Sequence, residues 1–178
     1  MSLDVRWLVP VAICAAAPQC LAARYITVEQ ARALIFPFAD EFVARPVQLT
    51  PQQAQEIDRL SGVTGRSTPP QVWRAEAKGK LIGWLFVDQV IGKRELITYS
   101  VGINPDGSIQ QVQVIEYLET VGSQVRYPRW NGQFVGKTAR DPVQIDSDIE
   151  NISGATLSSR HVTDGIRRLL FLHQVVLR

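Results

Sequence analysis

Residues 96–117 read LITYSVGINPDGSIQQVQVIEY, and this stretch decides the fold. Residues that favour β-strands lie on both sides of Asn104-Pro105-Asp106-Gly107, a turn whose Pro and Gly favour a chain reversal. The pattern predicts two antiparallel strands, at 96–103 and 109–117. A period of two also begins at Val72 and continues through 81–87, across a turn at Gly79-Lys80. The sequence therefore predicts an antiparallel β meander.

Helices are predicted on both sides of this meander. Thr27-Val28-Glu29-Gln30 and Thr50-Pro51-Gln52-Gln53 each place a glutamine three residues after a threonine, which is the capping-box pattern of a helix start. We expect Pro37 to kink or end the first helix. Near the C-terminus, residues that recur at helical spacing predict an amphipathic helix, namely Val162, Ile166, Leu169, Leu170 and His173.

These elements predict a single α+β domain. In chain order it has N-terminal helices, the antiparallel β meander, a long loop from Glu119 to about residue 148, and the C-terminal helix. We divide the chain into a signal peptide at 1–23, an N-terminal helical region at 24–70 and the main domain at 71–178. The mature chain of about 155 residues is enough for one core and too short for two.

Residues 1–23 predict a secretory signal. The apolar run from Trp7 to Ala17 is too short to span a bilayer comfortably, and the small residues after it suggest cleavage behind Ala22 or Ala23. The alternatives are a buried hydrophobic helix or an anchor that is retained. Cleavage would remove Cys14 and Cys20, so we expect a periplasmic protein that is stabilised by its core and has no disulfide.

The charge balance argues against one class of function. The formal net charge is +2, and Lys and Arg occur only singly or in short pairs. A nucleic-acid-binding protein would need a strongly basic face. We therefore expect no nucleic-acid partner.

The segment Glu150-Asn151-Ile152-Ser153-Gly154-Ala155-Thr156-Leu157-Ser158-Ser159 carries the strongest functional signal. It places two small residues and then a hydroxyl just before the C-terminal helix. The unpaired N–H groups and partial positive charge of a helix N-terminus stabilise an anion such as a phosphate or phosphodiester beside Thr156. The alternative is an ordinary loop in which Ser158 or Ser159 caps the helix.

Three segments resemble the FMN-binding domain family, which includes flavin subunits of the sodium-pumping NADH:quinone oxidoreductase and of the Rnf complex. They are the Ser-Gly-Ala-Thr segment with its helix, Glu119-Thr120-Val121-Gly122, and Trp130-Asn131-Gly132-Gln133-Phe134-Val135-Gly136-Lys137. In that family FMN is joined through its phosphate to the threonine. The resemblance implies that residues 71–178 form the FMN-binding domain and that a flavin transferase attaches FMN to Thr156 using FAD.

The resemblance also implies which residues hold FMN. Glu150 stands where the family pattern usually has Asp and would be the carboxylate that the transferase recognises. The phosphate end would be shaped by Ser153, Gly154, Ala155, Ser158 and Ser159. The ring end would be contacted by Glu119, Thr120, Gly122 and Trp130, and we expect Trp130 to lie in a loop and stack on the flavin.

The chain is therefore expected to be an exported flavoprotein that relays electrons between a membrane-bound reductase or cytochrome and another redox partner. Whether it is an enzyme in its own right stays open. One alternative is a flavin-dependent reductase that binds FMN without a covalent bond. Another is a binding or assembly module without flavin.

Three other segments resemble known ligand-binding motifs but do not match them. Gly132 and Gly136 are separated by three residues, whereas a phosphate-binding P-loop needs four. Asp146, Asp148 and Glu150 alternate, but the sequence lacks the glycine and the glutamate of a calcium-binding EF-hand loop. The two histidines lack the further ligands that a zinc site requires. We expect no metal site and name no catalytic residue.

Overall fold

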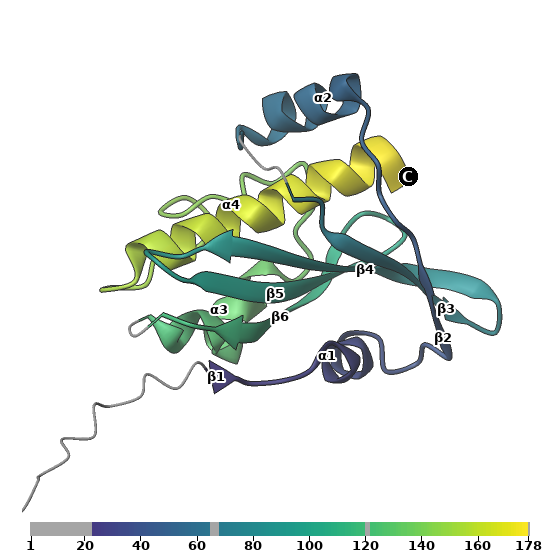
Figure 1. The fold of residues 1–178 in the computed structure, drawn as a ribbon, viewed down its shortest axis with the longest axis horizontal. Helices are drawn as coiled ribbons and strands as arrows, with labels where there is room; N and C mark the ends of the chain where they lie inside the picture. Colours follow the sequence, from purple (N-terminus) through teal and green to yellow (C-terminus); the bar gives the residue numbers. More distant parts are fainter. Residues whose placement is uncertain (1–22, 65–67, 120–121, 178) are drawn as a thin grey trace, which may run out of the picture.

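The computed structural model describes residues 23–64, 68–119 and 122–177. Nearly all of the predicted signal peptide, residues 1–22, and the predicted ring contact Thr120 lie outside these ranges. The described chain forms one six-stranded antiparallel sheet with strand order β1-β6-β5-β4-β3-β2. Helix α1 covers one face, while α4 covers the other and carries α2 on its outer side (Figure 1). The α+β architecture predicted from the sequence is confirmed.

The four central strands form the predicted meander. They are β3 (Gln71–Ala77), β4 (Lys80–Ile91), β5 (Leu96–Ile103) and β6 (Ile109–Tyr117), and each pairs with the next. The turn between β5 and β6 is closed by Asp106, whose carboxylate accepts hydrogen bonds from the backbone and hydroxyl of Ser108. Strands β5 and β6 have the predicted bounds.

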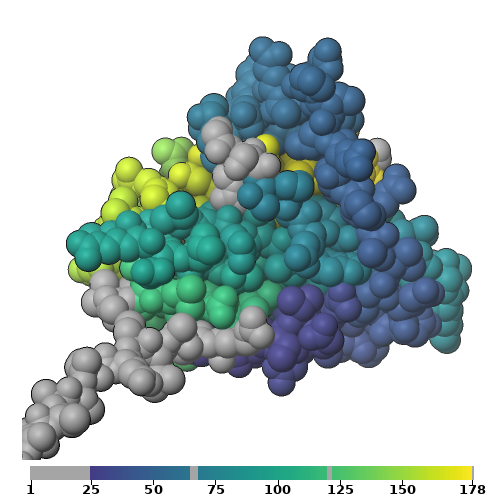
Figure 2. All heavy atoms as spheres, viewed as in Figure 1, coloured from purple at the N-terminus to yellow at the C-terminus, as the bar shows by residue number. Residues whose placement is uncertain are grey.

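Both N-terminal helices begin with the predicted capping boxes. Helix α1 (Val28–Ile35) is capped by Thr27, and α2 (Pro51–Ser61) by Thr50. Helix α1 ends two residues before Pro37, because the residue before a proline disfavours helical geometry. Helix α2 projects as a ridge from the top of the molecule (Figure 2).

Residues 24–70 are not purely helical, which corrects the sequence-based description of this region. Strand β2 (Glu41–Ala44) pairs with β3, and β1 (Ala23–Arg24) pairs with β6. They form the two edges of the sheet that the rest of the chain builds. The N-terminal region is thus part of the same folded unit as the meander.

The C-terminal helix α4 (Thr156–Leu172) encloses the main core against the sheet, and a π-helical turn, η3 (His173–Leu177), follows it. The predicted stripe of α4 is buried. Gly165 lies so close to the sheet that a Cβ built there would be 2.1 Å from the Tyr99 hydroxyl. The glycine therefore lets α4 approach β5.

The segment predicted as one long loop contains three short helices. They are η1 (Ser123–Arg126), α3 (Pro128–Asn131) and η2 (Gly132–Phe134). Their buried side chains, Val125, Trp130 and Phe134, join the main core. Among the described helices, none is both long enough and apolar enough to cross a membrane.

Candidate functional site

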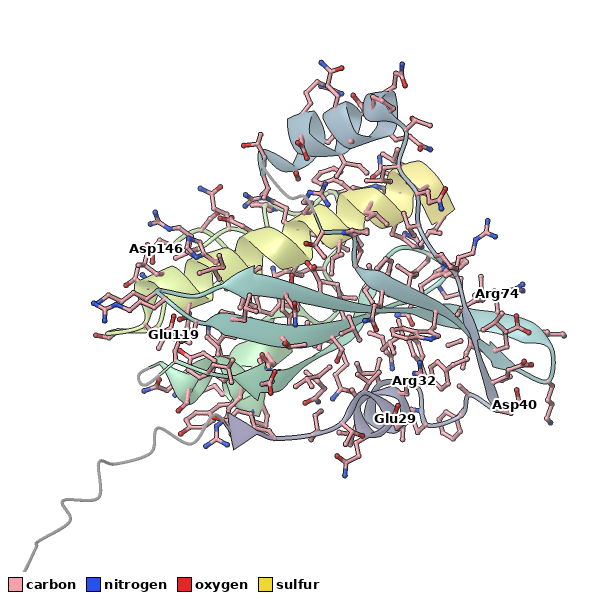
Figure 3. The ribbon with its side chains drawn as sticks, viewed as in Figure 1. Glu29, Arg32, Asp40, Arg74, Glu119 and Asp146 are labelled. Atoms are coloured by element: carbon pink, nitrogen blue, oxygen red, sulfur yellow. The ribbon has the colours of Figure 1, made fainter. Side chains whose placement is uncertain are left out.

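Three segments that are distant in sequence meet at one end of the sheet. They are the turn between β4 and β5, the chain after β6, and the start of α4. In Figure 3 the labelled Glu119 lies at this end. The segments enclose a pocket of about 260 Å³ lined by Lys93, Glu119, Gly154, Ala155, Thr156, Leu157 and Ser158. The structure thus brings together residues that the sequence analysis selected from two separate motifs.

Thr156 is the first residue of α4 and is exposed. The first hydrogen bond of the helix runs from Ser159 N–H to the Ala155 carbonyl at 3.0 Å. The amides of Thr156, Leu157 and Ser158 therefore precede the helical ladder and carry the partial positive charge of the helix N-terminus. The predicted position of Thr156 at the N-terminus of the C-terminal helix is present.

Ser158 and Ser159 do not cap the helix, because both lie within its first turn and are buried. The Ser159 hydroxyl donates to Asn151 Oδ1 at 2.8 Å, and that oxygen also accepts from Ile152 N–H at 2.8 Å. Ser159 does not line the pocket. Its hydrogen bond to Asn151 fixes the loop that precedes Thr156, so Ser159 supports the pocket from outside its lining.

Ser158 lines the pocket and lies 3.1 Å from the Tyr117 hydroxyl, with which it shares a hydrogen bond. Desolvation raises the pKa of Tyr117 despite the Ser158 contact, and the nearby Glu119 charge raises it further. The phenol therefore stays protonated at neutral pH. This pair links the end of β6 to the first turn of α4 beneath the pocket.

Glu119 binds the β4–β5 turn. One carboxylate oxygen accepts hydrogen bonds from Arg94 N–H at 2.5 Å and Glu95 N–H at 3.0 Å. Desolvation raises the pKa of this carboxyl, but the backbone amides of Glu95, Arg94 and Lys93 and the Lys93 charge together hold it below its ordinary value. Glu119 is therefore a carboxylate at neutral pH.

Lys93 is a pocket residue that the sequence analysis missed. It is the one Lys or Arg among the lining residues, and it lies in the turn that Glu119 holds. In the sequence, the one indication of such a role is that Lys93 lies in the short turn between two predicted strands. Only the tertiary fold shows that this turn faces the start of α4.

Gly122 packs directly on the Thr156 loop. Its φ is +90°, which favours glycine, and a Cβ built there would lie 2.4 Å from the Ala155 Cβ and 2.6 Å from the Tyr117 hydroxyl. Gly154 also has a positive φ, of +80°, but its surroundings are open. Gly122 therefore contacts the loop that carries Thr156 but does not line the pocket.

The predicted loop around Trp130 is a short helix, which corrects the sequence-based description of this residue. It lies in α3 rather than in a loop, is 5% exposed, and packs edge-on against Phe134 with ring centroids 5.1 Å apart. Its indole N–H donates to the Glu150 carbonyl at 2.9 Å. An aromatic ring buried in this way packs the core, and here it also fixes the backbone before the Thr156 loop.

Glu150 and Ser153 are exposed and lie outside the pocket lining. The Glu150 N–H donates to Gln133 Oε1 at 2.7 Å, so the Trp-Asn-Gly-Gln segment holds this residue in two places. The Glu150 carboxylate remains accessible to a macromolecule. A larger cavity of about 750 Å³ runs along β4 and contains none of the predicted site residues that the structure describes.

Comparisons with known proteins indicate which proteins the chain resembles. Residues 92–170 match the model of a family described as "FMN-binding domain". The chain is similar to a subunit of the Na(+)-translocating ferredoxin:NAD(+) oxidoreductase complex of Acetobacterium woodii, with 25% identity over 160 residues that cover 81% of this chain and 72% of the relative.

Two further similarities were found. A subunit of the proton-translocating ferredoxin:NAD(+) oxidoreductase complex of Clostridium ljungdahlii is 27% identical over 121 residues, or 63% of each chain. The crystal structure of Shewanella oneidensis NqrC aligns with a TM-score of 0.49 and 20% identity, covering 80% of this chain and 73% of that chain.

Proposed function

Because the chain carries a domain of the FMN-binding domain family, as its motifs predicted, we propose that it is a flavoprotein with FMN joined through a phosphoester to Thr156. The observation that carries the proposal is the position of the Thr156 hydroxyl. Thr156 is exposed at the positive end of a 17-residue helix and lines a pocket that also contains Lys93.

The pocket suits the phosphate end of FMN. Its volume of about 260 Å³ is below the range of roughly 300–1,000 Å³ that is typical of sites enclosing a whole small ligand. Gly154, Ala155 and Ser158 form the wall around the ester, and the flavin ring extends out of the pocket. Glu150 is the carboxylate on which the flavin transferase docks.

When bound, FMN supplies one- and two-electron chemistry. The chain holds the phosphate, orients the ester and leaves the ring accessible to a redox partner. Two relatives are named as subunits of ferredoxin:NAD(+) oxidoreductase complexes. We therefore propose an electron-transfer component that works with a membrane-bound reductase or a cytochrome.

We also propose that the protein is exported to the periplasm. Residues 1–23 act as a signal peptide, and the cleavage expected behind Ala22 or Ala23 lies where strand β1 begins. The N-terminal region 24–70 and the FMN-binding domain 71–178 then function together in the periplasm. A covalent bond keeps the cofactor at high local concentration where released FMN would be lost by dilution.

The intact mass of the protein tests the attachment. With a flavin transferase, the Thr156 hydroxyl would attack the pyrophosphate of FAD, form the phosphoester to FMN and release AMP. Co-expression should therefore add one FMN less water to the mature chain, and Thr156→Ala should give a folded, colourless protein without this addition. Thr64→Ala removes another exposed threonine, outside the pocket, and should retain the flavin. Undiminished flavin on Thr156→Ala would contradict the assignment.

The same samples separate the two alternatives. A protein that binds FMN without a covalent bond loses its colour on denaturation and gel filtration. A module without flavin never shows flavin absorbance, even with the transferase present. Either result on the wild-type chain would replace the covalent proposal.

A further inference from the structure

Glu119 and Lys93 occupy the same pocket but differ in what they can do there. The Glu119 carboxylate is directed at the backbone of the β4–β5 turn, with contacts of 2.5 Å and 3.0 Å to the amides of Arg94 and Glu95. Lys93 belongs to that turn, and its exposed side chain lines the pocket. Glu119 therefore holds the β4–β5 turn, which carries the Lys93 ammonium group.

The turn is held from two sides. Gly92 N–H donates to the Glu95 carbonyl at 2.8 Å, and a Cβ built on Gly92 would lie 2.7 Å from the contacting Glu119 oxygen. From α4, His161 Nδ1 lies 2.6 Å from the Ile91 carbonyl oxygen and 3.0 Å from the Gly92 carbonyl oxygen. These contacts fix the turn beside the first turns of α4.

Glu119 and Lys93 carry opposite charges, so they interact differently with an anion bound in the pocket. A phosphodiester is an anion at neutral pH, so a carboxylate in direct contact with it would be repelled. The Glu119 charge is compensated by backbone amides and by Lys93. The Lys93 ammonium is attracted to the same anion, as are the amides at the start of α4.

We propose that Lys93 is the cationic ligand of the flavin phosphate and that Glu119 is a positioning residue that acts through Lys93. This inference rests on the proposed attachment of FMN at Thr156. It also replaces the expectation that Glu119 contacts the flavin ring. Removing either side chain weakens the same interaction.

A double-mutant cycle tests this assignment. Wild type, Lys93→Met, Glu119→Gln and the double variant are incubated with transferase and FAD, and intact mass gives the rate of flavin attachment. Losing a charge-assisted contact should slow attachment about tenfold or more in Lys93→Met. Glu119→Gln should also be slower, and the double variant should equal Lys93→Met alone.

Two controls accompany the cycle. Arg94→Met removes the same charge from the same turn, but its side chain does not line the pocket, so attachment should be unchanged. Lys93→Arg keeps the charge and should retain most of the rate. Amide hydrogen exchange at Arg94 and Glu95 should accelerate in Glu119→Gln but not in Lys93→Met, whether or not flavin is present.

The outcomes distinguish this inference from the proposed function. If wild type acquires flavin but the two single effects multiply in the double variant, Glu119 acts independently and the inference fails. It also fails if Lys93→Met attaches flavin at the wild-type rate.

If wild type acquires no flavin, the proposed attachment fails, and the unmodified chain is titrated with inorganic phosphate while the backbone amide shifts are followed. Phosphate binding that weakens about tenfold in Lys93→Met would support Lys93 as the anion ligand. Absence of phosphate binding to wild type would overturn it.

Discussion

Replacing Gly122 with alanine should disrupt the packing between the chain after β6 and the loop that carries Thr156. The new Cβ would lie 2.4 Å from the Ala155 Cβ and 2.6 Å from the Tyr117 hydroxyl, well inside van der Waals contact. Ala155 is 5% exposed and Tyr117 is 2% exposed, so neither can move into solvent. The backbone on one side of the contact must shift.

The expected cost has two parts. Alanine in a left-handed conformation costs roughly 1–2 kcal/mol. Inserting a methyl group into a packed interface costs roughly 1–3 kcal/mol more. Gly122→Ala should therefore lower the free energy of unfolding by about 2–5 kcal/mol, which for an m-value of about 2 kcal/mol/M is a fall of about 1–2.5 M in the urea midpoint.

Gly136→Ala provides the matched control. Gly136 has a similar φ of +79°, but a Cβ built there meets nothing within 4 Å. This variant should show the conformational cost alone, about 1–2 kcal/mol. Urea unfolding followed by circular dichroism gives both values. Equal losses in the two variants would refute the close packing of Gly122 on Ala155.

Two further predictions concern the supporting structure. Gly165→Ala should destabilise the chain by about 1–3 kcal/mol, because its Cβ would lie 2.1 Å from the buried Tyr99 hydroxyl. Adding Tyr99→Phe to this variant should recover part of the loss, and urea unfolding measures both effects. A Gly165→Ala variant that is more stable than wild type would contradict the close packing. Burial raises the pKa of Asp148, but the Lys137 ammonium at 2.8 Å and two backbone amides lower it overall. The resulting stability is present above the unfolded-state pKa of about 3.9 and is lost as pH falls through the lower folded-state value. Asp148→Asn should therefore be less stable than wild type by roughly 1–3 kcal/mol at pH 7, with the difference shrinking below about pH 4, and a pH-independent difference would rule out this linkage.

The sequence predicted the elements whose signal is local. Strands 96–103 and 109–117 were predicted to the residue because a turn with Pro and Gly separates two runs of β-formers. Threonine and glutamine at capping-box spacing located both N-terminal helices. Strand β2 was missed because it has four residues, mostly exposed, and is stabilised by pairing with β3.

The site was predicted only in part, because a sequence motif does not specify which side chains are buried or which long-range contacts they make. Trp130 follows a family-like pattern, yet its environment is set by Phe134 and by the carbonyl of Glu150. Lys93 belongs to no recognised motif and lines the pocket only because Glu119 and α4 hold its turn. Such residues can be identified only after the strands and helices are assembled.

The structure also narrows which hydroxyl can be esterified. The segment 153–159 contains four hydroxyl side chains, those of Ser153, Thr156, Ser158 and Ser159. Ser158 and Ser159 are 3% and 0% exposed and hydrogen-bonded, so a transferase cannot reach them without unfolding the first turn of α4. Ser153 is exposed but precedes the helix and lies outside the pocket. Among these four residues, Thr156 alone is exposed, lines the pocket and lies at the helix N-terminus, so accessibility and electrostatics favour the acceptor that the family resemblance implies.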